Sequence, residues 1–168
     1  MKRSSLVNTA LLLALLGLCA WLVLFAIKGG AAAPGSTPAE TRAQEQSDIT
    51  RAARTETLAF LAIDYKKMDE LTDRVVEGST GEFEKQYKSS LKSLKETAIS
   101  QESISKGHVN EVGLSEFDED SAVVFVSAGS KVQNKGTKGE VEDRSWRIKL
   151  SMVKEGSRWL ISQLEFVG

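Results

Sequence analysis

The sequence predicts an α+β protein, in which an N-terminal transmembrane helix precedes a domain of about three helices packed on a curved antiparallel sheet of about four strands. Three observations lead to this fold class: a charge-free stretch from residue 6 to residue 27, apolar residues at helical spacing up to about residue 98, and apolar–polar alternation with a period of two from about residue 106. An antiparallel sheet needs cover on one face, and the preceding helices can supply it.

The first element is the stretch from Leu6 to Ile27, whose only clearly polar residues are Asn8 and Thr9. Its 22 residues would span roughly 33 Å as a helix, at ~1.5 Å per residue, which is enough for a hydrocarbon core of about 30 Å. We therefore expect a retained transmembrane helix at 6–27, preceded by a short cytoplasmic tail at 1–5.

Three alternatives for this stretch fit less well. A cleaved signal peptide has an apolar core of only about 7–15 residues, and Pro34 would follow a cut after Ala31–Ala33. A lipoprotein signal needs a small residue before its cysteine, whereas Leu18 precedes Cys19. A buried core helix rarely stays apolar on all sides for this length.

The charges flanking the stretch predict its orientation. Lys2 and Arg3 precede it and only Lys28 follows closely, so the N-terminus is expected in the cytoplasm and the C-terminal domain outside the cell membrane. Without these three, 19 of the 22 basic residues face 23 acidic residues, a net charge of −4, which gives no electrostatic case for nucleic acid. Cys19 is the only cysteine, so the outer part holds neither a disulfide nor a cysteine-ligated metal.

Residues 28–36 form the expected linker, and residues 37–168 the outer domain. Thr37, Pro38 and Glu40 are typical of a helix start with a capping box, and this helix is expected to run to about Lys67. A second short helix is predicted from about Asp69 to Glu77, ending at Gly78.

A third helix should follow the second capping-box pattern at residues 79–82. Its apolar residues recur in steps of four, four, three and four and form one stripe: Phe83, Tyr87, Leu91, Leu94 and Ala98.

The strands follow from the alternating segments. Val112 and Leu114 belong to the first, Ala122–Ala128 to the second, Trp146–Met152 to the third and Trp159–Val167 to the last. Glu155-Gly156-Ser157 is expected to form a tight hairpin, and Gly129–Asp143 a longer polar loop.

Several segments in this order resemble one family: "FLAIDYKKMDEL", "STGEFEKQY", "GHVNEVGL" and "WRIKLSMVKEGSRWLISQLEFVG", together with the charge-free anchor. The ordered set resembles the Mce-associated membrane proteins of actinobacteria over nearly the whole chain. That resemblance implies an outer domain with the nuclear transport factor 2-like cone fold. It also implies an accessory role beside Mce complexes, which carry lipids or sterols across the cell envelope, with Mce subunits and the bilayer as partners. It implies no catalytic residue and no cofactor.

The residues themselves leave catalysis open as an alternative. Asp64, Tyr65, Asp69 and His108 are the candidates for acid–base work in a cavity between helices and sheet. Adjacent helical positions point about 100° apart, so Asp64 and Tyr65 cannot both face one cavity. We therefore expect them to finish the first helix, with Asp64 pairing locally with Lys67 or remaining solvated.

Metal and phosphate sites are not expected. His108 alone is too few ligands for zinc, and we expect it at the surface or at a strand edge. Asp118–Ser121 lacks the spacing of a calcium loop and reads as a turn between strands. The stretch "GTKGE" at 136–140 lacks the pattern of a nucleotide loop.

Aromatic residues are the remaining candidates for a binding site. Phe60, Phe83, Tyr87, Trp146 and Phe166, with Trp159, are expected to form core or to line a cavity that accommodates a lipid or sterol. Three hypotheses for function therefore stand: a non-enzymatic accessory protein of an Mce-type transporter, a scaffold of another envelope machine such as type IV secretion, and an enzyme or lipid carrier with a true cavity.

Overall fold

The structure is a computed structural model that describes residues 37–168, of which residues 43–168 form one compact unit. The predicted tail at 1–5, transmembrane helix at 6–27 with Cys19, and linker at 28–36 lie outside the described residues. Within 37–168, no helix combines the length and the apolar character needed to cross a membrane.

Helix α2, Pro38–Leu61, begins with the predicted capping box. The Thr37 backbone N–H donates to Glu40 Oε2 (2.6 Å), and the Glu40 N–H donates to Thr37 Oγ1 (3.2 Å). Hydrogen bonds from the Thr37 backbone and side chain to the carboxylate lower the pKa of Glu40. In the second half, every fourth residue is buried, and this row faces the sheet: Ile49, Ala53, Thr57 and Leu61.

The predicted end of this helix at about Lys67 is wrong, because α2 stops at Leu61 and a short strand β1, Ile63–Asp64, follows. Ile63 pairs with Ser105 and Asp64 with Ile104, so β1 satisfies the backbone at the start of the next strand. The Ser105 hydroxyl also donates to the Leu61 carbonyl (2.8 Å) and thereby satisfies an acceptor in the last turn of the helix. Tertiary pairing thus overrides the local helical signal.

Helices α3, Met68–Glu77, and α4, Gly81–Gln101, agree with the prediction in place and type. The second capping box is wrong, because the Ser79 hydroxyl donates to the Val76 carbonyl (3.0 Å), and the residue that precedes the helix, Thr80, makes no side-chain cap hydrogen bond. Its hydroxyl donates instead to Glu155 Oε1 (2.6 Å), in the last hairpin of the chain. Helix α4 ends where Glu102 adopts a left-handed conformation with φ of 50°.

The sheet has five antiparallel strands in the order β1-β2-β3-β4-β5, one more than the approximate four predicted. Register shifts at Asn110 and Ser115 in β2 and at Ser162 in β5 are bulges, which increase twist and curvature. The long strands are β2 Ile104–Phe117, β3 Ser121–Gln133, β4 Glu142–Glu155 and β5 Arg158–Phe166.

One connection between strands is shorter than predicted. The expected loop 129–143 shrinks to residues 134–141, because β3 and β4 pair as far as Val132 and Glu142. Asn134 and Thr137 exchange hydrogen bonds between side chain and backbone across this turn. The hairpin at Gly156 is confirmed, and its φ of +61° is the conformation in which glycine is favoured.

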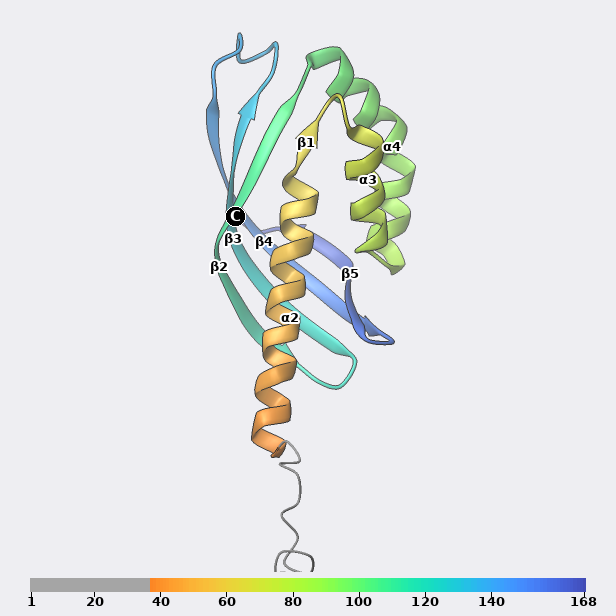
Figure 1. Cartoon of the computed structure of the whole chain (residues 1–168), viewed down its shortest axis with the longest axis vertical. Coiled ribbons are helices and arrows are strands. Elements are labelled where there is room, and N and C mark those ends of the chain that lie inside the picture. The colour runs from red at the N-terminus through yellow and green to blue at the C-terminus, as the bar shows by residue number, and fades with distance from the viewer. Residues whose placement is uncertain (1–36) are drawn as a thin grey trace, which may run out of the picture. The chain divides into compact units, whose positions relative to one another are not determined.

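All three helices lie on the same side of the curved sheet (Figure 1). Alternate residues of β3 and β4 point into this core, so the predicted α+β arrangement is confirmed. The buried apolar cluster comprises Ile49, Ala53, Leu61, Val75, Phe83, Ala122, Val124, Val126, Ala128, Ile148, Leu150, Met152, Trp159 and Ile161.

Candidate functional site

Five aromatic side chains from four elements meet between the helices and the sheet. Phe60, near the end of α2, lies 6.0 Å from Phe83, 6.4 Å from Tyr87 and 6.2 Å from Phe166, measured between ring centroids. Trp146 of β4 lies 5.4 Å from Phe166 at the end of β5. These separations are typical of aromatic pairs in contact. The five residues proposed from the sequence as cavity lining are thus neighbours in space.

A cavity of about 310 Å³ opens beside this cluster. Phe60, Tyr87, Trp146 and Phe166 border it, whereas Phe83 is buried in the core and does not. Trp159, the sixth aromatic residue weighed, is also core, with the Lys154 ammonium 5.5 Å from its ring. The other lining residues are Leu61, Ala62, Ile63, Met68, Leu71, Thr72, Leu94, Ser103, Ser105, Ser130, Val132 and Asn134.

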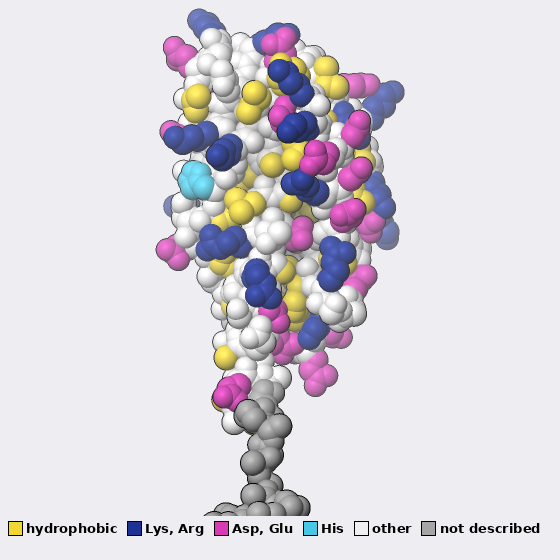
Figure 2. Space-filling model, viewed as in Figure 1, with side chains coloured by type: hydrophobic (Ala, Val, Ile, Leu, Met, Phe, Trp, Pro, Cys, Tyr) yellow, Lys and Arg dark blue, Asp and Glu magenta, His cyan; other side chains and the backbone are white. Residues whose placement is uncertain are grey.

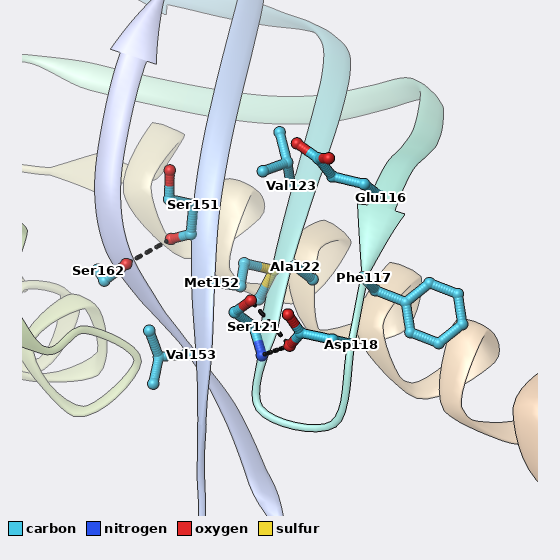
Figure 3. Close-up of a pocket in the computed structure, with 10 residues that line it drawn as sticks. All are labelled: Glu116, Phe117, Asp118, Ser121, Ala122, Val123, Ser151, Met152, Val153 and Ser162. Atoms are coloured by element: carbon cyan, nitrogen blue, oxygen red, sulfur yellow. Dashed lines mark hydrogen bonds between the residues drawn. The ribbon is translucent and has the colours of Figure 1, made fainter.

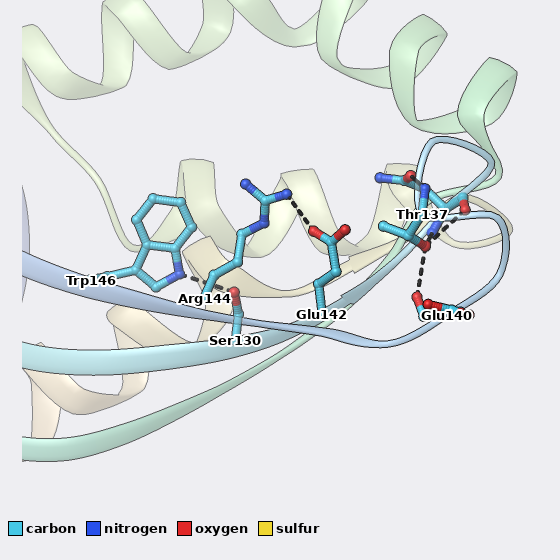
Figure 4. A network of polar contacts seen from close by, with 7 residues as sticks. Ser130, Thr137, Glu140, Glu142, Arg144 and Trp146 are labelled. Atoms are coloured by element: carbon cyan, nitrogen blue, oxygen red, sulfur yellow. Dashed lines mark hydrogen bonds and ion pairs between the residues drawn. The ribbon is translucent and has the colours of Figure 1, made fainter.

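One hydrogen bond fixes the orientation of the Trp146 ring. Its Nε1–H donates to the hydroxyl oxygen of Ser130 at 2.9 Å, and the two residues are diagonal neighbours on β4 and β3, because Ser130 pairs with Arg144 (Figure 4). Ser130 is only 1% exposed, so this bond satisfies a buried acceptor. Two serines of the cavity wall, Ser105 and Ser130, do not stand out in the sequence, because serine at an alternating strand position is equally compatible with the solvent face.

Tyr87 keeps its phenolic proton to a higher pH than an ordinary tyrosine does. Burial raises the pKa of its phenol to about 12 from 10.0, because the charged phenolate would lose hydration among these rings. The group at the cavity wall is therefore a neutral hydroxyl at physiological pH.

The candidates for acid–base chemistry do not converge on this cavity. Asp64 lies in β1, and its carboxylate accepts the backbone N–H of Lys66 at 3.0 Å rather than pairing with the Lys67 side chain. The Tyr65 ring packs under the Lys66 ammonium, 5.3 Å from its centroid, and borders a separate surface pocket. Asp69 is exposed on α3 and forms an ion pair with Lys95 at 2.6 Å.

His108 and the acidic turn are likewise apart from the cavity. His108 is exposed within β2, opposite Gly129, where the imidazole lies over the glycine. Asp118 closes the β2–β3 turn, since its Oδ1 accepts both the backbone N–H and the hydroxyl of Ser121 at 2.8 Å. These hydrogen bonds lower the pKa of Asp118. Among the described residues, no three His, Cys, Asp or Glu side chains gather as a metal site would require.

One carboxylate is partly buried where α2 meets the α3–α4 connection. Burial raises the pKa of Glu56, Arg158 opposes this shift and Glu77 adds to it. Arg158 also donates to the Glu77 carbonyl at 2.8 Å, so it ties β5 to the end of α3. This arrangement is structural, because its charge partners all belong to the packing of these elements.

The opposite face of the sheet carries a second hollow of about 400 Å³ near the β2–β3 turn (Figure 3). Val123 of β3, Ser151 and Val153 of β4 and Glu116 of β2 border it. Further along β3, Phe125 is 44% exposed and lies opposite Gly113. We call this surface the outer sheet face.

Charges on the molecule are mixed. On the view of Figure 2, acidic and basic side chains are interspersed, with apolar side chains between them. Many form local pairs, such as Lys135 with Glu102 (2.9 Å) and Lys149 with Glu165 (3.6 Å). Such a surface favours no polyanionic partner.

Comparison with protein families gives a match over nearly the whole chain. The model of the family described as "Uncharacterized protein Rv1363c/MT1408-like" matches residues 5–168. Rv1363c of Mycobacterium tuberculosis is 31% identical over 130 residues, which cover 77% of this chain and 49% of that protein. The chain thus spans about half the length of this relative.

Solved structures share the fold at low sequence identity. An IcmL-like type IV secretion system protein of Legionella pneumophila has a TM-score of 0.59 at 11% identity, with coverage of 72% of this chain and 91% of that one. The periplasmic domain of DotI gives 0.59 at 10% (72% and 94%). CagV of Helicobacter pylori, a VirB8 homolog, gives 0.58 at 4% (72% and 97%). The described domain therefore has the nuclear transport factor 2-like cone fold, which it shares with these three structures.

Proposed function

Because the chain belongs to the Rv1363c/MT1408-like family and has this cone fold, we propose that it is a non-enzymatic, membrane-anchored docking module of a machine in the cell envelope. The charge-free stretch Leu6–Ile27 is the anchor, with the N-terminus in the cytoplasm and the domain outside the membrane. A tethered domain meets membrane partners at high effective concentration, so modest contacts suffice for assembly.

The observation that carries the docking role is the outer sheet face. The helices cover only one side of the sheet, and the other side presents Phe125, 44% exposed, beside a hollow bordered by Val123 and Val153. Large apolar groups rimmed by polar ones are typical of protein interfaces, in which aromatic residues act as anchors. Gly113 lies opposite Phe125 and leaves the side of its ring open to a partner.

The scattered positions of Asp64, Asp69 and His108 support a non-enzymatic role. A general base must reach its substrate proton within hydrogen-bond distance, and none of these three borders the aromatic cavity.

We infer that the machine is an Mce-type transporter of lipids or sterols, on the basis of the resemblance of the ordered segments to Mce-associated membrane proteins. A type IV secretion machine is the second candidate, and the fold shared with the IcmL-like protein, DotI and CagV favours it.

Photocrosslinking in native membranes tests both proposals. A photoreactive phenylalanine analogue at Phe125 of the full chain should capture a subunit of the machine, and the same analogue at Ile99, exposed on α4, is the matched control. Capture of lipid-transporter subunits supports the first machine, and capture of secretion subunits the second. Equal labelling from both positions, or none from Phe125, would contradict docking by this face.

The anchor has its own test. Removal of residues 1–28, with export restored by a cleavable signal, should give a folded domain that no longer supports lipid uptake. Full uptake with this secreted form would show that the anchor is dispensable.

A further inference from the structure

The aromatic cavity has a lining that contains no charged side chain. Its sixteen bordering residues include no Asp, Glu, Lys, Arg or His, and eleven are Phe, Trp, Tyr, Leu, Ile, Val, Met or Ala. A site of this kind gains affinity by removing apolar surface from water and would penalise a buried charge. Its chemistry therefore selects an apolar, uncharged occupant.

The volume limits the size of that occupant. At about 30 Å³ per water-sized group, a cavity of about 310 Å³ holds roughly ten such groups. One chain of about ten methylenes is of this size, whereas a lipid with two long chains is several times larger.

The polar atoms of the wall are mostly engaged already. Ser105 donates to the Leu61 carbonyl (2.8 Å), Thr72 donates to the Met68 carbonyl (2.7 Å), and Ser130 accepts from Trp146 (2.9 Å). Tyr87, by contrast, makes no side-chain hydrogen bond to any residue that the structure describes. Its phenol is thus available to pair with one polar group of an occupant.

The strand beside the cavity carries an ion pair in line with Trp146. Glu142, Arg144 and Trp146 alternate along β4 and therefore share one face of the strand (Figure 4). Arg144 donates to Glu142 at 2.8 Å, and both side chains are 50% exposed. Because the guanidinium is already neutralised by its neighbour, it adds little attraction for an anionic head group.

We propose that this cavity binds a single-chain amphiphile with an uncharged hydroxyl-type head group and a chain of about ten carbons, in which the head group pairs with Tyr87 and the chain packs among Phe60, Trp146 and Phe166. This binding is independent of the docking role, because the cavity and the outer sheet face lie on opposite sides of the sheet.

The test uses the full chain in lipid nanodiscs with a ten-carbon alcohol that carries a diazirine near its chain end. After photolysis, mass spectrometry should place the label on peptides that contain Phe60, Leu94 or Trp146. Unlabelled 1-decanol should compete at least tenfold better than decanoate at equal amounts in the bilayer. Label confined to exposed residues, or equal competition by decanoate, would overturn the proposal.

Paired variants locate the site. Leu94→Trp fills the cavity from α4 and should lower labelling at least fivefold, whereas Ile99→Trp, on the exposed side of the same helix, should leave it unchanged. Tyr87→Phe removes one hydroxyl and should weaken competition by 1-decanol about two- to tenfold. Tyr87→Phe tests the site even if circular dichroism shows that Leu94→Trp does not fold. Unchanged labelling in folded Leu94→Trp, or unchanged competition in Tyr87→Phe, would refute the assigned site.

Discussion

Substitution of Gly107 by alanine should destabilise the domain, because the end of α2 packs directly on this position of β2. A Cβ built on Gly107 would lie 2.7 Å from Leu61 Cβ and 3.3 Å from Leu61 Cδ1. The nearest atom is the Cβ of Leu61, so rotation of the leucine side chain cannot relieve the contact. Either the helix end or the strand must move.

The magnitude follows from two opposing terms. Overpacking of a well-packed core costs about 1–3 kcal/mol. Alanine also restricts the unfolded chain, which returns about 0.4–1 kcal/mol where the backbone accepts it, as it does here because Gly107 is not among the residues with positive φ. The free energy of unfolding should therefore fall by about 1–2 kcal/mol.

Gly113→Ala is the matched control on the same strand. A Cβ there meets only the Phe125 carbonyl oxygen at 3.9 Å, which is ordinary contact. This variant should be unchanged or up to about 1 kcal/mol more stable. Urea unfolding of residues 37–168, followed by tryptophan fluorescence, should separate the two midpoints by roughly 1 M, given slopes of about 1–3 kcal/mol per M. Equal midpoints would refute the close approach of α2 to β2.

Three further predictions test the site and the residues considered for catalysis. Trp146→Phe removes the hydrogen bond to buried Ser130. A double-mutant cycle with Ser130→Ala, measured by urea unfolding, should therefore give a coupling energy of about 0.5–1.5 kcal/mol. A coupling energy near zero would show that the bond is not formed. The Tyr87 pKa of about 12 in the folded domain exceeds the ordinary 10.0, so the contribution of this phenol to stability is complete below pH 10 and is lost as the pH rises towards 12. The difference between the absorbance titrations of wild type and Tyr87→Phe should have its midpoint near 12. A midpoint near 10 would contradict burial of the phenol. Asp64→Asn and His108→Ala should each leave lipid uptake intact, and loss of uptake in a normally folded variant would revive a catalytic role.

Periodicity predicted the long elements well. The stripe of Phe83, Tyr87 and Leu94 identifies the buried face of α4 because a helix of this length repeats its pattern several times. Alternation in β3 and β4 likewise predicts Val124 and Ile148 as core. The aromatic neighbours of the cavity follow from the same patterns, since large rings on inward positions must meet where the sheet curves.

Features that depend on a distant partner could not be predicted. Strand β1 has two residues, which is too short to show an apolar–polar period. It forms by pairing with Ile104 and Ser105, which are distant in the sequence. The hydroxyl of Thr80 could cap a helix locally, but it donates instead to the Glu155 carboxylate in the β4–β5 turn. Bulges such as the one at Ser162 leave no mark in composition, although they decide how far the sheet bends.

The short bridge between Ser79 and Ile161 affects how one copy of the domain can meet another, because it closes part of a sheet edge. The Thr80 N–H donates to the Ile161 carbonyl and the Ile161 N–H donates to the Gly78 carbonyl, so the middle of β5 cannot template a further strand. At the other edge, β1 and a hydrogen bond from Arg54 to the Val109 carbonyl occupy parts of β2. Copies of the domain therefore have shorter open stretches of sheet edge through which to pair, and strand-to-strand association at these positions would first require the small closures to open.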